Sequence, residues 1–203
     1  RPPAAGARWD CGNAATAARF RPGAVALGRG TFVVDGSPAM RRRPIQPLLD
    51  GLQALGVDAR SREATGCPPV VVNARGIAGG RARVRGDISS QYLSALLMAA
   101  PYAARDVEIE IEGELVSAPY VTMTLSTMEE FGGRAERDGD RRFCVPAGQH
   151  YAARGYAVEP DASGASYFFA AAAATGGRVV VRGLGSRSAQ GDLGLLDVLA
   201  RMG

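Results

Sequence analysis

The sequence predicts a mixed α+β fold made of repeated βαβαββ units. Two series of helices repeat along the chain. In the first series a polar capping residue precedes an apolar run, and the three caps, Asn13, Asp87 and Asp161, lie 74 residues apart in succession. The second series consists of amphipathic helices that end at glycines spaced by 76 and 71 residues, the last of them Gly203. A repeat of this length is longer than a solenoid repeat and is typical of a small subdomain.

The first unit is expected to contain a helix, a strand, a second helix and two strands. In chain order these elements cover residues 13–27, 31–35, 44–55, 57–60 and 69–73. An Ala-rich run after Asn13 favours the first helix, and β-branched and aromatic residues favour the strand at 31–35. Pro44 suits the first turn of the second helix, because its missing N–H costs nothing there. Arg43, the last of three consecutive arginines, then lies at the start of this helix.

The second unit adds a leading strand to the same order. Its strands are expected at residues 80–86, 107–112, 134–137 and 142–145, and its helices at residues 87–98 and 117–132. Residues 80–86 alternate Arg with small or apolar residues, and residues 107–112 alternate Val or Ile with Glu, which is the period of a half-buried strand. Ser117 is the expected N-cap of its helix. The Asp-Gly-Asp sequence at 138–140 predicts the hairpin turn between the last two strands.

A third unit begins near residue 156. We expect a strand at 156–159, a helix that begins at Asp161, a strand at 178–182 and a final helix that begins at Gln190. The Ala-rich run of the Asp161 helix predicts close packing, because alanine lets neighbouring backbones approach one another.

The composition excludes several classes of function. Cys11, Cys67 and Cys144 are scattered without metal-ligand spacing, and His150 is the only histidine, which argues against a zinc site or a Ser-His triad. The net charge is +4, and all 24 basic residues are arginines spread along the chain, so nucleic-acid binding is not favoured. No apolar run reaches membrane-spanning length.

The start of the helix after Asp87 is suited to an anion. Ser89 and Ser90 provide hydroxyl groups in the first turn, and Gln91 adds an amide. Unpaired backbone N–H groups lie at the positive end of the helix dipole beside them. Considered alone, this stretch favours a capped buried helix without a ligand.

Several stretches together resemble the enolpyruvyl transferase family, in its branch that acts on shikimate 3-phosphate. They are residues 12–19, 43–45, 49–50, 86–91, 117–120 and 159–167. The resemblance implies two domains, each built from three βαβαββ units with helices packed inside, and a cleft to which helix N-termini converge. On this basis we expect residues 1–155 to be a substrate-binding domain that lacks its N-terminal part. Residues 156–203 would be the truncated start of the second domain.

The resemblance also implies ligand-binding residues. Shikimate 3-phosphate would be bound by Ser89, Ser90, Gln91, Ser117 and Tyr120. Phosphoenolpyruvate would be bound by Ala15, Arg43 and Gln91, with Asn13 and Thr16 nearby. The guanidinium of Arg43 suits a carboxylate or phosphate, which it can bind through two parallel hydrogen bonds. Asp161 is expected to be a structural cap only.

The implied reaction transfers the enolpyruvyl group from phosphoenolpyruvate to a hydroxyl of shikimate 3-phosphate, with release of phosphate, in the pathway to aromatic amino acids. It needs no metal or organic cofactor. The implied partners are these two small molecules, with no nucleic acid and no membrane. The full-length protein would be a cytoplasmic monomer.

The sequence departs from the family pattern in ways that limit these implications. Ala15 stands where the family usually has Gly, so weaker binding of the inhibitor glyphosate is expected, and a basic residue common at Ala118 is missing. No residue matches the catalytic lysines or the general-base Asp of the family, so the segment is expected to be inactive alone. Two alternatives are the branch that acts on UDP-N-acetylglucosamine, and a non-catalytic anion-binding domain.

Overall fold

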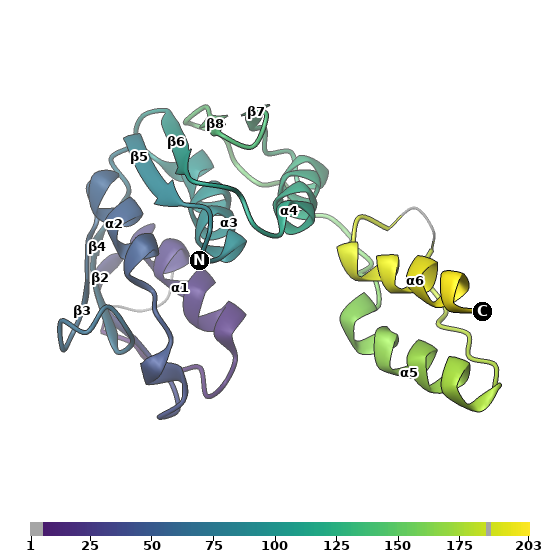
Figure 1. Cartoon of the computed structure of the whole chain (residues 1–203). Helices are drawn as coiled ribbons and strands as arrows, with labels where there is room; N and C mark the ends of the chain where they lie inside the picture. The colour runs from purple at the N-terminus through teal and green to yellow at the C-terminus, as the bar shows by residue number, and fades with distance from the viewer. Residues whose placement is uncertain (1–5, 186–187) are drawn as a thin grey trace. The chain divides into compact units, whose positions relative to one another are not determined.

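The computed structural model describes residues 6–185 and 188–203, and it divides the chain into two compact units (Figure 1). The first unit is Arg1–Ala152 and the second is Ala153–Gly203. Among the described helices, none has the length and apolar character needed to cross a bilayer. The assignment of residues 1–155 and 156–203 to functional domains stays a prediction.

The first half of the first unit is a complete βαβαββ motif. Its elements are β1 (Arg8–Asp10), α1 (Ala15–Ala26), β2 (Arg29–Asp35), α2 (Gln46–Ala54), β3 (Asp58–Ser61) and β4 (Val70–Arg75). A short 3₁₀ helix, Met40–Arg42, lies between β2 and α2. The strands form one sheet in the order β1-β2-β4-β3, in which only the β1–β2 pair is parallel. The sequence interpretation missed β1, which has only three residues.

The second half repeats this arrangement. Its elements are β5 (Gly80–Arg85), α3 (Ser90–Ala99), β6 (Val107–Glu112), α4 (Ala118–Glu130), β7 (Glu136–Asp138) and β8 (Arg142–Val145). The sheet has the order β5-β6-β8-β7, and its β5–β6 pair is parallel. The predicted fold class, a mixed α+β fold of repeated βαβαββ units, is therefore confirmed.

One hydrophobic core joins the two halves, because the helices pack between and against the sheets. Helix α2 contacts β3 of the first sheet and β5 of the second, while α1 contacts β2, β4 and α3 (Figure 1). The strands alternate buried and more exposed residues, as a sheet with one core-facing side requires. Phe32 on β2 pairs with Val72 on β4, and both side chains are fully buried. Helix α3 thus lies inside the unit, as expected, whereas α4 buries only Val121 and Met128.

Helices α1 and α3 approach each other at a glycine. A Cβ built on Gly23 would lie 2.8 Å from the backbone oxygen of Ala95. Alanine is the better helix former by about 1 kcal/mol, but here it would force the helices apart. We therefore expect Gly23→Ala to destabilise the unit by about 1–3 kcal/mol in urea unfolding. Gly194→Ala, at the start of a helix with no atom within 4 Å of the new Cβ, is the control, and equal midpoints for wild type and Gly23→Ala would contradict the prediction.

The second unit contains two helices, α5 (Ala162–Thr175) and α6 (Gly194–Met202), with a short 3₁₀ helix, Gly191–Leu193, before α6. The strands predicted at 156–159 and 178–182 are wrong, because both segments are irregular. In the first unit each parallel strand pair is continued by antiparallel strands. The described part of the second unit contains no such antiparallel strands. An isolated sheet of two strands is only marginally stable in water. Val158 and Val180 are accordingly 83% and 69% exposed.

The helix caps of the first series match the prediction only in part. Asp161 is confirmed, because its Oδ1 accepts a hydrogen bond of 2.9 Å from the N–H of Ser163. Asn13 is not a cap, since α1 begins two residues later without a side-chain capping bond. Asp87 is not a cap either, because its carboxylate pairs with Arg85 of β5. The N-cap of α3 is Ser89, which has an extended backbone and accepts a hydrogen bond from the N–H of Gln91.

Two other predicted helix starts also differ in detail. Helix α2 begins at Gln46, so Pro47 and not Pro44 occupies its first turn. Ser117 does precede α4, but it adopts a left-handed conformation with φ of 57° and its side chain makes no capping bond. These local details follow from the path of the preceding loop, which the residue type alone does not determine.

Candidate functional site

The N-terminal turns of α1 and α3 are joined by side-chain hydrogen bonds. Arg19 Nη1 donates to Gln91 Oε1 at 2.7 Å and to Ser89 Oγ at 3.3 Å. Gln91 Nε2 donates in turn to Thr16 Oγ1 at 3.1 Å. Ser89, Gln91 and Thr16, which the sequence assigned to two ligands, are therefore brought together. We call Thr16, Arg19, Ser89 and Gln91 the helix-start cluster.

The helix-start cluster keeps hydrogen-bonding capacity for a ligand. Ser89 Oγ accepts from the backbone N–H of Gln91 and from Arg19, which leaves its own hydroxyl proton to be donated. Gln91 uses one amide proton on Thr16, and its second proton can point to another acceptor. Both side chains are partly exposed. The cluster thus presents donors beside the positive end of α3, which suits a phosphate or carboxylate.

The segment that carries Arg43 is attached to the same helix. Tyr92 is fully buried, its hydroxyl donates to the backbone oxygen of Pro44 at 2.7 Å, and the Arg19 guanidinium lies 5.3 Å from its ring centroid. Burial raises the pKa of Tyr92 above its ordinary value, so the phenol stays protonated as a donor. Arg43 itself is exposed, and no ion pair or side-chain hydrogen bond joins it to the residues that the structure describes.

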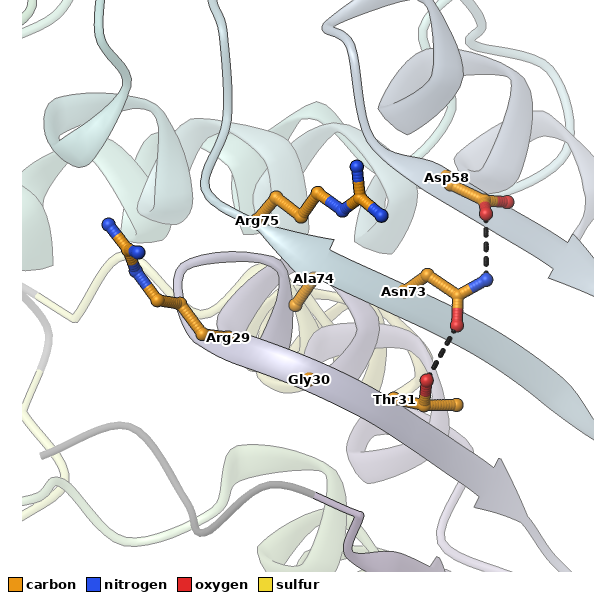
Figure 2. Close-up of a pocket in the computed structure, with 7 residues that line it drawn as sticks. All are labelled: Arg29, Gly30, Thr31, Asp58, Asn73, Ala74 and Arg75. Carbon is orange, nitrogen blue, oxygen red and sulfur yellow. Dashed lines mark hydrogen bonds between the residues drawn. The ribbon is translucent and has the colours of Figure 1, made fainter.

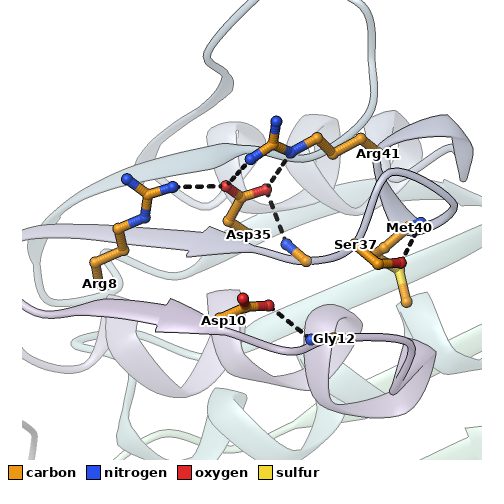
Figure 3. Close-up of polar contacts among 8 residues, drawn as sticks. Arg8, Asp10, Gly12, Asp35, Ser37, Met40 and Arg41 are labelled. Atoms are coloured by element: carbon orange, nitrogen blue, oxygen red, sulfur yellow. Dashed lines mark hydrogen bonds and ion pairs between the residues drawn. The ribbon is translucent and has the colours of Figure 1, made fainter.

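A second polar network centres on Asp35, the last residue of β2 (Figure 3). Asp35 accepts from Arg8 Nη2 at 2.9 Å and from Arg41 Nε and Nη2 at 2.9 and 2.7 Å. The hydrogen bond from Arg41 holds the pKa of the Asp35 carboxyl below its ordinary value. Nearby, the Ser37 hydroxyl donates a hydrogen bond to Asn13 Oδ1. Asn13 is thereby placed beside the loop that leads to Arg43.

Four further predicted ligand residues lie at the starts of α1, α3 and α4. Ala15 is the first residue of α1 and is partly exposed, whereas Ser90 is only 5% exposed. Ser117 and Tyr120 lie at the start of α4, where both are exposed. The N–H of Val116 donates to the oxygen of Gly86 at 3.1 Å, which holds this turn near the loop that precedes α3.

Three functional candidates were missed from the sequence. Arg19 lies four residues after Ala15, and residues at this spacing share one face of a helix, so its position near the helix start could have been inferred. Tyr92 was counted within the apolar helix, although its hydroxyl needed a partner. Asp35 was predicted as the last residue of the strand at 31–35, without a role in the site. Its burial depends on arginines that are distant in sequence or on the next turn.

A surface pocket of about 500 Å³ lies on the first sheet, away from the predicted ligand residues (Figure 2). It is lined by Arg29, Gly30, Thr31, Asp58, Asn73, Ala74 and Arg75. Thr31 Oγ1 donates to Asn73 Oδ1 at 2.8 Å, and Asn73 Nδ2 donates to Asp58 Oδ2 at 2.7 Å. Its central polar groups are therefore engaged with one another. The helix-start cluster remains the stronger candidate site.

Comparisons with known proteins show the family to which the chain belongs. The model of the family EPSP synthase (3-phosphoshikimate 1-carboxyvinyltransferase) matches residues 2–203. The chain is 54% identical over 197 residues to the chloroplastic 3-phosphoshikimate 1-carboxyvinyltransferase of Brassica napus, covering 95% of this chain and 38% of that protein. It is 48% identical over 193 residues to the enzyme of the same name from Marinomonas sp., covering 95% of this chain and 45% of that protein.

A solved structure gives the same result for the fold. EPSP synthase from Acinetobacter baumannii superposes with a TM-score of 0.70 at 20% identity, covering 84% of this chain and 37% of that one. The chain spans less than half the length of the two curated relatives. Because the family model matches nearly every residue, the chain belongs to the EPSP synthase family.

Proposed function

We propose that this chain supplies substrate-binding residues for transfer of the enolpyruvyl group from phosphoenolpyruvate to shikimate 3-phosphate. The observation that carries the proposal is the helix-start cluster, in which Arg19 orients Ser89 and Gln91 at the positive end of α3. Both ligands are anionic, and the cluster presents hydrogen-bond donors. The family membership supports the choice of substrates.

The proposed roles divide between the two ligands. Shikimate 3-phosphate is bound by the hydroxyls and the amide of Ser89, Ser90, Gln91, Ser117 and Tyr120. Phosphoenolpyruvate is bound by Arg43 and Gln91, beside Ala15, Asn13 and Thr16. Arg43 is suited to this role because its exposed guanidinium has no carboxylate partner among the described residues. The methyl group of Ala15 is proposed to crowd glyphosate.

The chemical step requires catalytic groups, the lysines and the general-base Asp of the family, to which no residue of this sequence corresponds. Charge neutralisation around two anions and a general acid and base are needed for addition and elimination. We propose that residues 1–155 are the substrate-binding domain and 156–203 the start of a second domain, and that the whole protein is a cytoplasmic monomer. The Brassica napus relative is named as chloroplastic, so fractionation of cells of the source is the test of the compartment.

Binding of shikimate 3-phosphate to the 203-residue chain tests the proposal. We expect saturable binding in calorimetry, and Ser89→Ala should weaken it about ten- to a hundredfold, since a hydrogen bond to a charged group contributes about 1.5–3 kcal/mol. Ser126→Ala, an exposed serine in the middle of α4, is the matched control and should leave the affinity unchanged.

Two outcomes would contradict the proposal. One is a folded chain that binds no shikimate 3-phosphate. The other is equal loss of affinity in Ser89→Ala and Ser126→Ala, which would place the ligand elsewhere. Binding of shikimate 3-phosphate without activity in the longer protein would favour a non-catalytic anion-binding domain, and preferential binding of UDP-N-acetylglucosamine would favour the other branch.

A further inference from the structure

The buried carboxylate of Asp35 is the starting point. Asp35 is 2% exposed, and a carboxylate is stable in such a place only when it is hydrogen-bonded and paired. Its carboxylate accepts hydrogen bonds from Arg8 Nη2, from Nε and Nη2 of Arg41, and from the N–H of Gly36 at 2.8 Å (Figure 3). The two arginine side chains remain 63% and 45% exposed, so the acid is the buried centre of the network.

The backbone around Asp35 is tied to the start of α1. The oxygen of Asp35 accepts from the N–H of Cys11 at 2.8 Å, and the N–H of Ser37 donates to the oxygen of Gly12 at 3.0 Å. A Cβ on Gly36 would lie 2.7 Å from the same Gly12 oxygen, so the two loops are in close contact. The end of β2 is therefore held against the loop that leads into α1.

The arginine run after this point has two different tasks. Arg41 lies in the 3₁₀ turn and is bound to Asp35 by two parallel hydrogen bonds, whereas Arg43 leaves the same turn with its guanidinium exposed. The N–H of Arg43 donates to the oxygen of Met40 at 2.9 Å, so the turn that Arg41 anchors also sets the backbone of Arg43. Fixing that backbone reduces the conformational freedom that ligand binding would have to remove.

We propose that Asp35 is a positioning residue: through Arg41 it holds the turn from which Arg43 reaches the anionic groups of phosphoenolpyruvate. This inference rests on the proposed function. Asp35 touches no ligand itself. Its effect is expected mainly on phosphoenolpyruvate, because its side-chain contact through Arg41 leads to Arg43, which is assigned to that ligand alone.

The test is Asp35→Asn in the 203-residue chain, with two measurements. Amide hydrogen exchange should become about tenfold faster or more at Ser37, Arg41 and Arg43, while the β2–β4 ladder stays protected. In calorimetry with shikimate 3-phosphate present, phosphoenolpyruvate affinity should fall about tenfold, with shikimate 3-phosphate affinity changed less than about twofold. Arg41→Lys, which keeps the charge and loses the paired hydrogen bonds, should show a smaller change in the same direction.

Asp58→Asn is the matched control, because Asp58 is an exposed acid of the same unit that pairs with Arg60. It should change neither measurement. If Asp35→Asn fails to fold, Arg41→Gln replaces it, since Arg41 is exposed and Asp35 keeps its hydrogen bonds from Arg8 and from the N–H of Gly36.

The outcomes separate this inference from the proposed function. Unchanged exchange in the turn, or wild-type phosphoenolpyruvate affinity in a variant whose turn has loosened, would overturn the inference alone. Equal loss of affinity for both ligands would also overturn it, because that is a general structural defect. A wild-type chain that binds shikimate 3-phosphate and no phosphoenolpyruvate would overturn the phosphoenolpyruvate role of this chain, and the inference with it.

Discussion

Tyr92→Ala is expected to destabilise the first unit by about 3–5 kcal/mol, the usual cost of deleting a buried aromatic side chain. Tyr92 is among the largest fully buried side chains, and it contributes both to the core and to the attachment of the Arg43 segment through Pro44. A loss of this size is a large part of the 5–15 kcal/mol typical of a domain. The measurement is urea unfolding followed by circular dichroism.

Tyr92→Phe separates the packing of this residue from its hydrogen bond. It should cost only about 1 kcal/mol, because the ring remains and one neutral hydrogen bond is lost. Tyr102→Ala is the control, since Tyr102 is 39% exposed. If Tyr92→Ala proved no more harmful than Tyr102→Ala, the burial of Tyr92 would not be contributing to stability as the structure indicates.

Arg19→Ala is expected to weaken shikimate 3-phosphate binding by about ten- to a hundredfold, although no role in the site was predicted for Arg19 from the sequence. Arg19 is the donor that holds Gln91 and Ser89 in one arrangement, and without it both side chains must be ordered when the ligand binds. Calorimetry on the 203-residue chain gives the affinity, and thermal unfolding shows whether the variant is folded.

Arg21→Ala is the matched control for Arg19→Ala. Arg21 is also partly buried on α1, but its guanidinium lies over the Trp9 ring and beside Cys11, away from Ser89 and Gln91. It should retain wild-type affinity. An Arg19→Ala chain that is folded and binds like wild type would show that Gln91 and Ser89 do not need this donor.

Elements with a strong hydrophobic period were predictable from the sequence. Residues 107–112 form β6 as expected, because strict alternation fits one buried face of a sheet and no helix. The 31–35 and 142–145 strands and the Gly56 and Gly132 helix ends were likewise found close to their expected positions. The strands predicted at 156–159 and 178–182 are not formed, because they lack neighbouring strands in the part of the chain that the structure describes. A strand pattern becomes a strand only where partners complete its hydrogen bonds, and partners are not a property of the segment itself.

The candidate site was predictable in residue type and only partly in geometry. Ser89 and Gln91 could be selected because a helix start with hydroxyls and an amide favours anions whatever surrounds it. The roles of Arg19, Tyr92 and Asp35 could not, since each depends on a partner that the chain brings near only by folding. The expected caps Asn13 and Asp87 failed for the same reason, because loop paths set by tertiary contacts decide where a helix begins.

The sequence by itself determined the repeat of βαβαββ units and the residues able to bind anions, because periodicity and side-chain chemistry are local properties. Only the tertiary structure decided which of those residues meet. Helices α1 and α3 are in contact at Gly23, and Thr16 and Arg19 are hydrogen-bonded to Gln91. The buried Asp35 binds Arg41, whereas the guanidinium of Arg43 stays exposed. The physical reason is that residues about 70 positions apart, such as Arg19 and Gln91, can form a hydrogen bond only after the core has brought their helices together.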